Sequence, residues 1–243
     1  MKRTFVIGDI HGGLKALKQV LQKAEVTNND TLIFLGDYVD GWGESAQVIS
    51  YVMDLSKWQE CIFIKGNHDV WCENWLRTGN ENIEWLNHGG RETMASYIAN
   101  IEIDKKTHLD FFEQMKYYFI DAENRLFIHA GFRSLHGPQQ EFKDGSIIWD
   151  RTLWQTAISS DKDMKKDSLL SPNRLMLYNE ILIGHTPTTN YGEALPMQGG
   201  NVWNIDTGAA FKGKLTIMNV DTKQYWQSDF LPNLYPAEKG RNK

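Results

Sequence analysis

Residues 4–12 read TFVIGDIHG, a short apolar run that stops at a glycine and is followed at once by Asp9 and His11. The same order recurs in residues 31–40 (TLIFLGDYVD) and in residues 61–69 (CIFIKGNHD). Runs of this length, bounded by glycine, are typical of buried strands. The three stretches therefore predict strands whose C-terminal ends carry the polar residues.

Helical patterns separate these strands. Apolar residues follow the spacing of one helical face between residues 14 and 24, and again between residues 48 and 53. Alternation of buried strands with helices predicts a parallel sheet with right-handed crossovers, which is an α/β fold. Ligands of such sheets bind beyond the C-terminal ends of the strands. Asp9, Asp37 and Asn67 are therefore expected to lie close together.

The rest of the chain divides into a helical part and a strand-rich part. Residues 70–117 are expected to be helical, with Thr107 and Asp110 resembling a capping box. Strands are then expected at residues 125–128, 146–149, 180–183, 201–205 and 214–220. They predict a second, mixed sheet packed on the first. We expect one domain over residues 1–231 and a flexible tail over residues 232–243.

Composition limits the class of protein. The chain has 243 residues, of which 41% are hydrophobic, enough for one large core. Its net charge of −5 argues against a strongly basic surface for a nucleic-acid polymer. The charged run at residues 161–167 mixes both signs and is interpreted as a solvated loop. Neither a signal peptide nor a membrane-spanning segment is recognisable, so a cytoplasmic location is expected.

Two more histidines follow apolar runs: His129, in HAG, and His185, in GHT. Aspartate and histidine together suit divalent manganese, iron or zinc. A pair of such ions about 3.5–4 Å apart can bind a phosphoryl group and activate a water for in-line attack. One aspartate after a strand is often only a helix cap. Five ordered motifs favour a metal site.

These five motifs, with residues 85–90 (WLNHGG), 148–151 (IWDR) and 205–209 (IDTGA), resemble a known family. The chain is similar to the phosphoprotein-phosphatase branch of the calcineurin-like metallophosphoesterases, and within it to the small phosphatases of the bacteriophage lambda type. The resemblance runs from Phe5 to about Val220. It implies a four-layer α/β/β/α sandwich with a dinuclear metal site at the strand ends.

The resemblance also implies six metal ligands, which are Asp9, His11, Asp37, Asn67, His129 and His185. Asp9 and His11 would bind the first ion, Asp37 would bridge both ions, and the other three would complete the second site. Two divalent ions are expected, with manganese preferred over iron or zinc.

Further roles follow from the same motifs. His68 is similar to the general acid that protonates the leaving oxygen, and Asp40 would orient it and support its charge. Arg151 matches an arginine that clamps phosphate oxygens, a role that suits the guanidinium group. Asn67 is also expected to touch the phosphate.

One position departs from the family pattern. The family's second motif continues Asp-Arg-Gly, whereas here Asp40 is followed by Gly-Trp-Gly, so an arginine is missing at Gly41. Arg133 is the first candidate to replace it, followed by Arg77 and Arg91. The neighbouring Trp42 has two interpretations: stacking on a nucleobase or phosphotyrosyl ring at the pocket rim, or ordinary packing.

Three functions are compatible with these motifs. The leading one is hydrolysis of phosphomonoesters by direct attack of a metal-bridging hydroxide, on phosphoserine, phosphothreonine or phosphotyrosine proteins or on small phosphoesters. The alternative is a diadenosine-tetraphosphate-type hydrolase, which shares the same metal motifs. A third class is a non-catalytic phosphate- or phosphopeptide-binding module. The presence of His68 and Asp40 argues against the third, because binding alone needs no acid.

Overall fold

The computed structural model describes residues 2–141, 145–160 and 172–242, so the charged run at residues 161–167 lies outside the described residues. The first sheet has the order β10-β9-β1-β2-β3. Its strands are β1 (Thr4–Ile7), β2 (Thr31–Phe34), β3 (Glu60–Phe63), β9 (Thr216–Asn219) and β10 (Tyr225–Gln227). The first three strands are parallel, as predicted, and β9 pairs antiparallel with β1.

The second sheet has the order β4-β5-β6-β8-β7. Its strands are β4 (Tyr118–Ile120), β5 (Arg125–Ile128), β6 (Glu180–Ile183), β7 (Met197–Gly199) and β8 (Val202–Asn204). Strands β5, β6 and β8 are parallel, whereas β4 and β7 are antiparallel edges. The sheet is mixed, as predicted.

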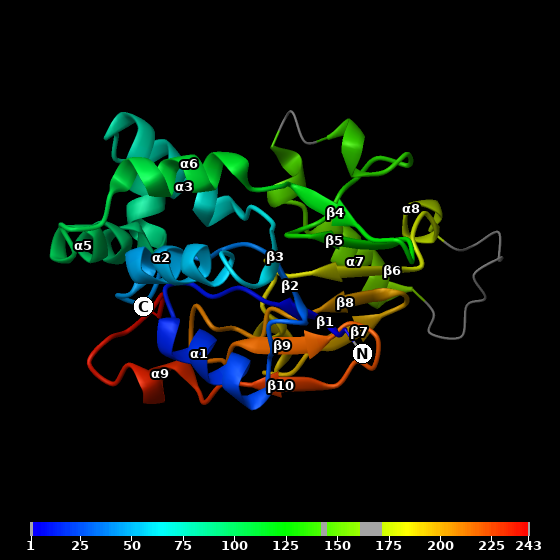
Figure 1. Cartoon of the computed structure of the whole chain (residues 1–243). Helices are drawn as coiled ribbons and strands as arrows, with labels where there is room; N and C mark the ends of the chain where they lie inside the picture. The colour runs from blue at the N-terminus through cyan, green and yellow to red at the C-terminus, as the bar shows by residue number, and fades with distance from the viewer. Residues whose placement is uncertain (1, 142–144, 161–171, 243) are drawn as a thin grey trace.

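Alternating side chains divide the core into layers. On β1, Val6 points into the cluster between the two sheets, whereas Phe5 and Ile7 belong to the cluster beneath the helices. On β5, Phe127 lies between the sheets and Leu126 faces outward. A strand that is buried on both faces has a continuous run of apolar residues in its sequence. The result is the predicted four-layer α/β/β/α sandwich (Figure 1).

The helices cover the outer faces. They are α1 (Leu14–Lys23), α2 (Ser45–Leu55), α3 (Asn67–Thr78), α4 (Ile83–Trp85), α5 (Arg91–Ala99), α6 (Lys105–Gln114), α7 (Thr152–Ser159), α8 (Asn173–Met176) and α9 (Leu231–Leu234). Helix α1 contacts the first sheet, α3, α5 and α6 gather beside α2, and α7 contacts the second sheet (Figure 1). No helix in the described part of the chain is long and apolar enough to cross a membrane.

Two local predictions are wrong. The strand expected at residues 146–149 is a 3-10 helix over Ser146–Ile148, in which the N–H groups of Trp149 and Asp150 donate to the Ser146 carbonyl. Short apolar runs do not distinguish strand from buried turn. Helix α6 is capped by Asp104, which accepts the N–H groups of Lys106 and Thr107, so the residues expected to form a capping box do not cap it.

The C-terminal segment, residues 232–242, packs against the domain instead of forming the expected flexible tail. The Tyr235 ring is buried and stacks on Trp42, with 5.2 Å between ring centroids. The Glu238 carboxylate accepts the Gly43 N–H at 2.7 Å. Trp42 itself is fully buried, and its Nε1–H donates to the Ala209 carbonyl at 2.7 Å. Trp42 is therefore a packing residue, and its interpretation as a stacking platform for substrate is wrong.

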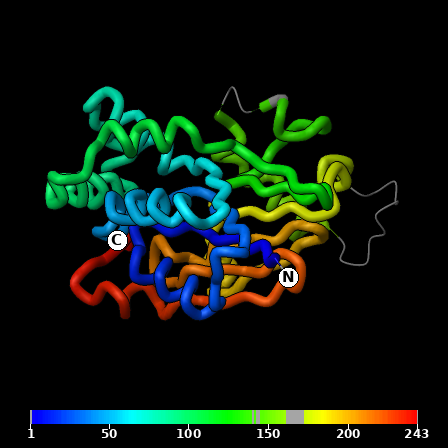
Figure 2. Tube along the Cα trace, viewed as in Figure 1, coloured from blue at the N-terminus to red at the C-terminus, as the bar shows by residue number. Residues whose placement is uncertain are grey.

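Figure 2 traces this segment in red, from α9 to a C-terminus that lies beside α2. The segment covers the loop that connects β2 to α2. This contact explains how a polar, proline-containing stretch becomes ordered. Tyr235 of the C-terminal segment and Trp42 of the loop bury their rings against each other.

We expect Tyr235→Ala to lower the free energy of unfolding by roughly 3 kcal/mol, because it removes a buried aromatic ring and uncovers Trp42. Urea unfolding followed by circular dichroism measures this change. The matched control is Phe230→Ala, which lies just before this segment and is 43% exposed, and which should cost about 1 kcal/mol or less. Equal losses for the two variants would contradict the packed segment.

Candidate active site

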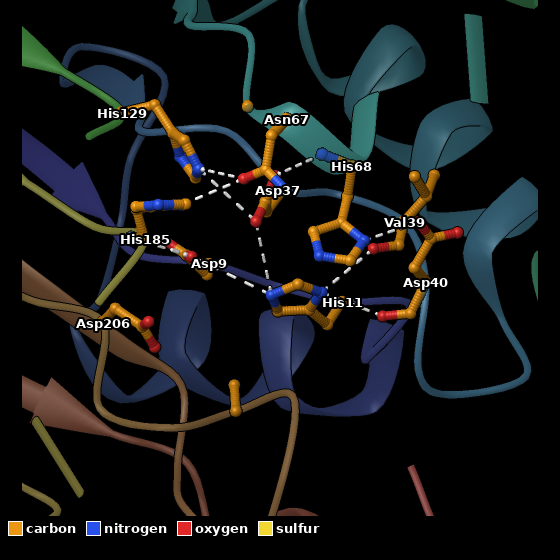
Figure 3. Close-up of polar contacts among 12 residues, drawn as sticks. Asp9, His11, Asp37, Val39, Asp40, Asn67, His68, His129, His185 and Asp206 are labelled. Carbon is orange, nitrogen blue, oxygen red and sulfur yellow. Dashed lines mark hydrogen bonds and ion pairs between the residues drawn. The ribbon is translucent and has the colours of Figure 1, made fainter. Parts of the chain in front are cut away.

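The structure brings the six predicted metal ligands to one buried cluster (Figure 3). Each lies at or just beyond the end of a strand: Asp9 and His11 after β1, Asp37 after β2, Asn67 at the start of α3, His129 after β5, and His185 after β6. The first four come from the first sheet and the two later histidines from the second. The cluster therefore lies where the two sheets meet.

Asp37 is the common member of the cluster. Its Oδ2 lies 3.6 Å from His11 Nε2 and 3.4 Å from His129 Nε2. Two sets of side chains place a possible ligand atom from each member within 4.8 Å of the others. One set is Asp37 with His11 and His68, and the other is Asp37 with His129 and His185. This arrangement suits a carboxylate shared between two ions.

The Nδ1 atoms of two imidazoles, those of His11 and His129, face backbone carbonyls. His11 Nδ1 lies 2.9 Å from the backbone carbonyl oxygen of Asp40, and His129 Nδ1 lies 2.8 Å from that of Leu35. A carbonyl only accepts, so each Nδ1 carries a hydrogen, and in the neutral ring the Nε2 lone pair is directed at Asp37. An imidazole fixed in this way is a common arrangement for a metal ligand.

Electrostatics also favours a cation here. Burial lowers the pKa of His129, but the charge and hydrogen bond of Asp37 raise it to about 10. Burial acts to raise the pKa of Asp37, yet the neighbouring histidines hold it well below its usual range. His185 Nε2 is buried without a hydrogen-bond partner among the described residues. The residues present thus fit a divalent metal ion.

Asn67 and Asp69 start helix α3 and serve different parts of the site. Asn67 Oδ1 lies 3.1 Å from His129 Nε2 and 3.0 Å from His185 Nδ1. The Asp69 carboxylate accepts three backbone N–H groups, those of Asp37 at 2.8 Å, Tyr38 at 2.9 Å and Gly66 at 2.8 Å. Asp69 therefore ties the loop that bears Asp37 to the start of α3.

The backbone turns sharply where the site residues stand. His11, Asp37, Asp40 and His185 all adopt positive φ, between 51° and 73°. This conformation is unfavourable for residues other than glycine and is often retained at functional sites. At Gly184 no side chain fits, because a β-carbon would lie 2.0 Å from Asp9 Oδ1. That glycine lets the end of β6, in the second sheet, lie close to Asp9, which follows β1.

His68 and Asp40 form a buried pair, with Nδ1 and Oδ2 2.6 Å apart. Asp40 also accepts the Trp85 Nε1–H and the Thr93 hydroxyl. Burial raises the pKa of Asp40 to about 8 and lowers that of His68 to about 3. The pair then has no net charge and shares one proton between Nδ1 and Oδ2.

The position of that shared proton does not change the protonation of His68 Nε2. If the proton lies on Asp40, the neutral imidazole keeps its hydrogen on Nε2, and if it lies on His68 the imidazolium also carries Nε2–H. Figure 3 shows this nitrogen pointing toward the space between Asp37 and His11. A proton is therefore held at the cluster in both arrangements.

A pocket opens over the cluster. His11, Asp37, Asn67, His68 and His185 line it, together with Arg151, Arg241, Asp206, Phe211, Trp71, Trp149, His88 and three other residues. Arg151 is thus placed where a phosphate-binding role requires it. Trp149 stands at the pocket with 44% of its surface exposed, and its ring lies 5.1 Å from that of Trp71.

Arg133, the first candidate to replace the missing arginine, does not line this pocket. Its side chain is 58% exposed and its Nε lies 3.9 Å from Glu141 Oε2. Arg77 pairs with Glu73, and neither it nor Arg91 lines the pocket.

Several pocket residues were not predicted as site residues, among them Asp206, Trp149 and Arg241. Asp206 is buried and follows an apolar strand, which is the same signal that identified Asp37. Trp149 is the last residue of the run at residues 146–149 that the sequence predicts as a strand. No pattern in the sequence pointed to Arg241.

A model of the calcineurin-like phosphoesterase family matches residues 2–210. The chain belongs to this family. It is accordingly a metallophosphoesterase, a hydrolase of phosphoric esters, which confirms the resemblance drawn from the motifs.

Several relatives span nearly the whole chain. Bis(5'-nucleosyl)-tetraphosphatase PrpE [asymmetrical] from Anoxybacillus flavithermus is 28% identical over 238 residues, 88% of both chains. The protein of the same name from Oceanobacillus iheyensis is 25% identical and covers 90% of this chain and 89% of its own.

Solved structures share the fold at lower identity. A proposed diadenosine tetraphosphatase superposes with a TM-score of 0.63 at 15% identity, covering 93% of this chain and 92% of its own. A cold-active protein tyrosine phosphatase gives a TM-score of 0.57 at 14% identity, with coverage of 93% and 78%. These likenesses bear on the fold alone.

We expect manganese to raise the melting temperature of the metal-stripped protein by several degrees, because an ion that binds only the folded state stabilises it by about 2.7 kcal/mol at a hundred times its dissociation constant. Asp37→Asn should abolish most of this rise, since Asp37 belongs to both ligand sets. Differential scanning calorimetry with and without manganese measures it. The control is Asp54→Asn, a 70% exposed carboxylate, and equal shifts in both variants would refute the site.

Proposed function

We propose that the chain hydrolyses bis(5'-nucleosyl) tetraphosphates asymmetrically, with phosphoprotein hydrolysis as the second candidate. The observation that carries this choice is the likeness to PrpE enzymes, at 25–28% identity over nearly nine-tenths of both chains. The preference for phosphoproteins that the motifs first favoured becomes the second candidate, because the same metal motifs serve both substrates. A cytoplasmic location stays a prediction.

We assign the metal-binding role to the six predicted ligands, with manganese as the expected ion and iron or zinc as alternatives. Asp37 would be shared between two ions, Asp9 and His11 would bind the first, and Asn67, His129 and His185 the second. When bound, these ions supply Lewis-acid activation of the phosphate and of the attacking water.

The protein's own residues position the substrate and deliver a proton. Arg151 lines the pocket and would hold phosphate oxygens, and Asn67 would reach the same phosphate. Water attacks one phosphorus atom as the bridging P–O bond breaks. The hydrogen on His68 Nε2 passes to the departing phosphate oxygen, and Asp40 supports the imidazole as it exchanges its proton with solvent.

The exposed face of Trp149 supports a nucleotide substrate. Its ring adjoins those of Trp71 and His185, so the wall of the pocket nearest the ligands is aromatic. Stacking of a base on an aromatic ring contributes about 1–3 kcal/mol in single-stranded nucleic-acid complexes. A phosphoserine peptide has no such ring to place there.

We expect diadenosine tetraphosphate to be hydrolysed with a higher kcat/KM than phosphoserine peptides, in the presence of manganese. Trp149→Ala should raise the KM for diadenosine tetraphosphate roughly tenfold and change little the hydrolysis of an alkyl phosphate, which has no ring to stack. Trp58→Ala, another exposed tryptophan, is the matched control. Preference for phosphopeptides, with equal effects of Trp149→Ala on all substrates, would favour the second candidate. Tight phosphopeptide binding without turnover would indicate a binding module.

His68→Asn should lower kcat by about 10²–10⁴-fold for alkyl phosphates, whose leaving oxygen needs a proton. The loss should be smaller for p-nitrophenyl phosphate, because its leaving group is a weaker base. Steady-state kinetics on both substrates tests this difference. The control is His136→Asn, an exposed histidine. Equal losses on both substrates would argue against an acid role for His68.

A further inference from the structure

The C-terminal segment brings a second arginine to the pocket. Arg241 lines it together with His11 and Asp206, and lies near enough to Asp37 and Asp40 to interact with their charges. Among the described residues, none accepts a hydrogen bond from its guanidinium group or forms an ion pair with it. A planar group with five N–H donors is therefore available for an anionic ligand.

Other contacts hold Arg241 in this position. Its backbone N–H donates to the Ala210 carbonyl at 2.9 Å, and its Cζ lies 5.2 Å from the centroid of the Phe211 ring. Phe211 is itself part of the pocket wall. The backbone of Arg241 and the face of its guanidinium group are thus held by contacts that leave the guanidinium N–H donors unused.

The loop at Gly41 fits this segment. A β-carbon at Gly41 would lie 3.4 Å from Arg241 Cγ, so a longer side chain there would occupy the space of the arginine stem. Gly41 also has a φ of 123°, which disfavours other residues. Earlier in the same segment, Tyr235 stacks on Trp42 and Glu238 accepts the Gly43 N–H. The Gly-Trp-Gly sequence therefore forms the surface on which the C-terminal segment packs.

We propose that Arg241 binds the phosphate of the substrate, so that the C-terminal segment supplies the guanidinium group that the second motif lacks at Gly41. The inference rests on the proposed phosphoester hydrolysis. A guanidinium can donate two parallel hydrogen bonds to phosphate oxygens, which a lysine cannot. Arg241 and Arg151 would then contact the phosphate from segments far apart in the sequence.

The test measures inorganic phosphate binding by calorimetry, with the manganese-loaded full-length chain. We expect Arg241→Gln to weaken phosphate binding on the order of 10- to 100-fold, because it removes a charge-assisted contact. Arg241→Lys should recover part of the affinity. The control Lys239→Gln removes the same charge from an exposed residue of the same segment and should leave binding unchanged. The manganese-induced rise in melting temperature should persist in all variants.

The outcomes separate this inference from the proposed function. Wild-type affinity in Arg241→Gln, or no phosphate binding by the wild type, would overturn the inference. A lower melting temperature with unchanged affinity would also overturn it, since Arg241 would then only balance the buried carboxylates. Loss of phosphate binding in Arg241→Gln, in a protein whose wild type hydrolyses phosphomonoesters but not dinucleoside tetraphosphates, would refute the proposed substrate and leave the inference standing.

Discussion

Where parallel strands end, backbone N–H groups lose their partners in the sheet, and burying them unpaired is costly. Asp69 accepts three such groups, from Asp37, Tyr38 and Gly66, with one carboxylate. This contact joins the turn after β2 to the start of α3. Asp37 is thereby held in a strained conformation at the centre of the ligand cluster, and Asn67 and His68 start their helix beside it.

The cluster also depends on how the two sheets pack. Val6 of β1 and Phe127 of β5 share the core between the sheets, and this packing sets the distance between ligands from the first sheet and the two histidines of the second. Backbone carbonyls then orient the imidazoles, so that their Nε2 atoms converge on Asp37. Hydrophobic packing, backbone hydrogen bonds and charge therefore together determine the positions of the ligand side chains around Asp37.

Local rules predicted much of this arrangement and failed at identifiable points. Strand-end position was enough to place Asp9, Asp37 and Asn67 together, because parallel strands end at one edge of a sheet. The run at residues 146–149 was misassigned because a buried 3-10 turn and a short strand have the same apolar pattern. Arg241 was beyond prediction, since its place depends on the long-range contact between Tyr235 and Trp42. Polar residues in a tail show no periodicity that reveals such a contact.

The pairing of β1 with β9 has a consequence for the synthesis of the protein. Strand β1 is synthesised well before its antiparallel neighbour, which begins only at Thr216. Until then one edge of β1 has no partner, and an unpaired edge is prone to pair with other chains. The first sheet can close only after β9 has been synthesised, so the exposed edge of β1 would need protection until then, for example by a chaperone.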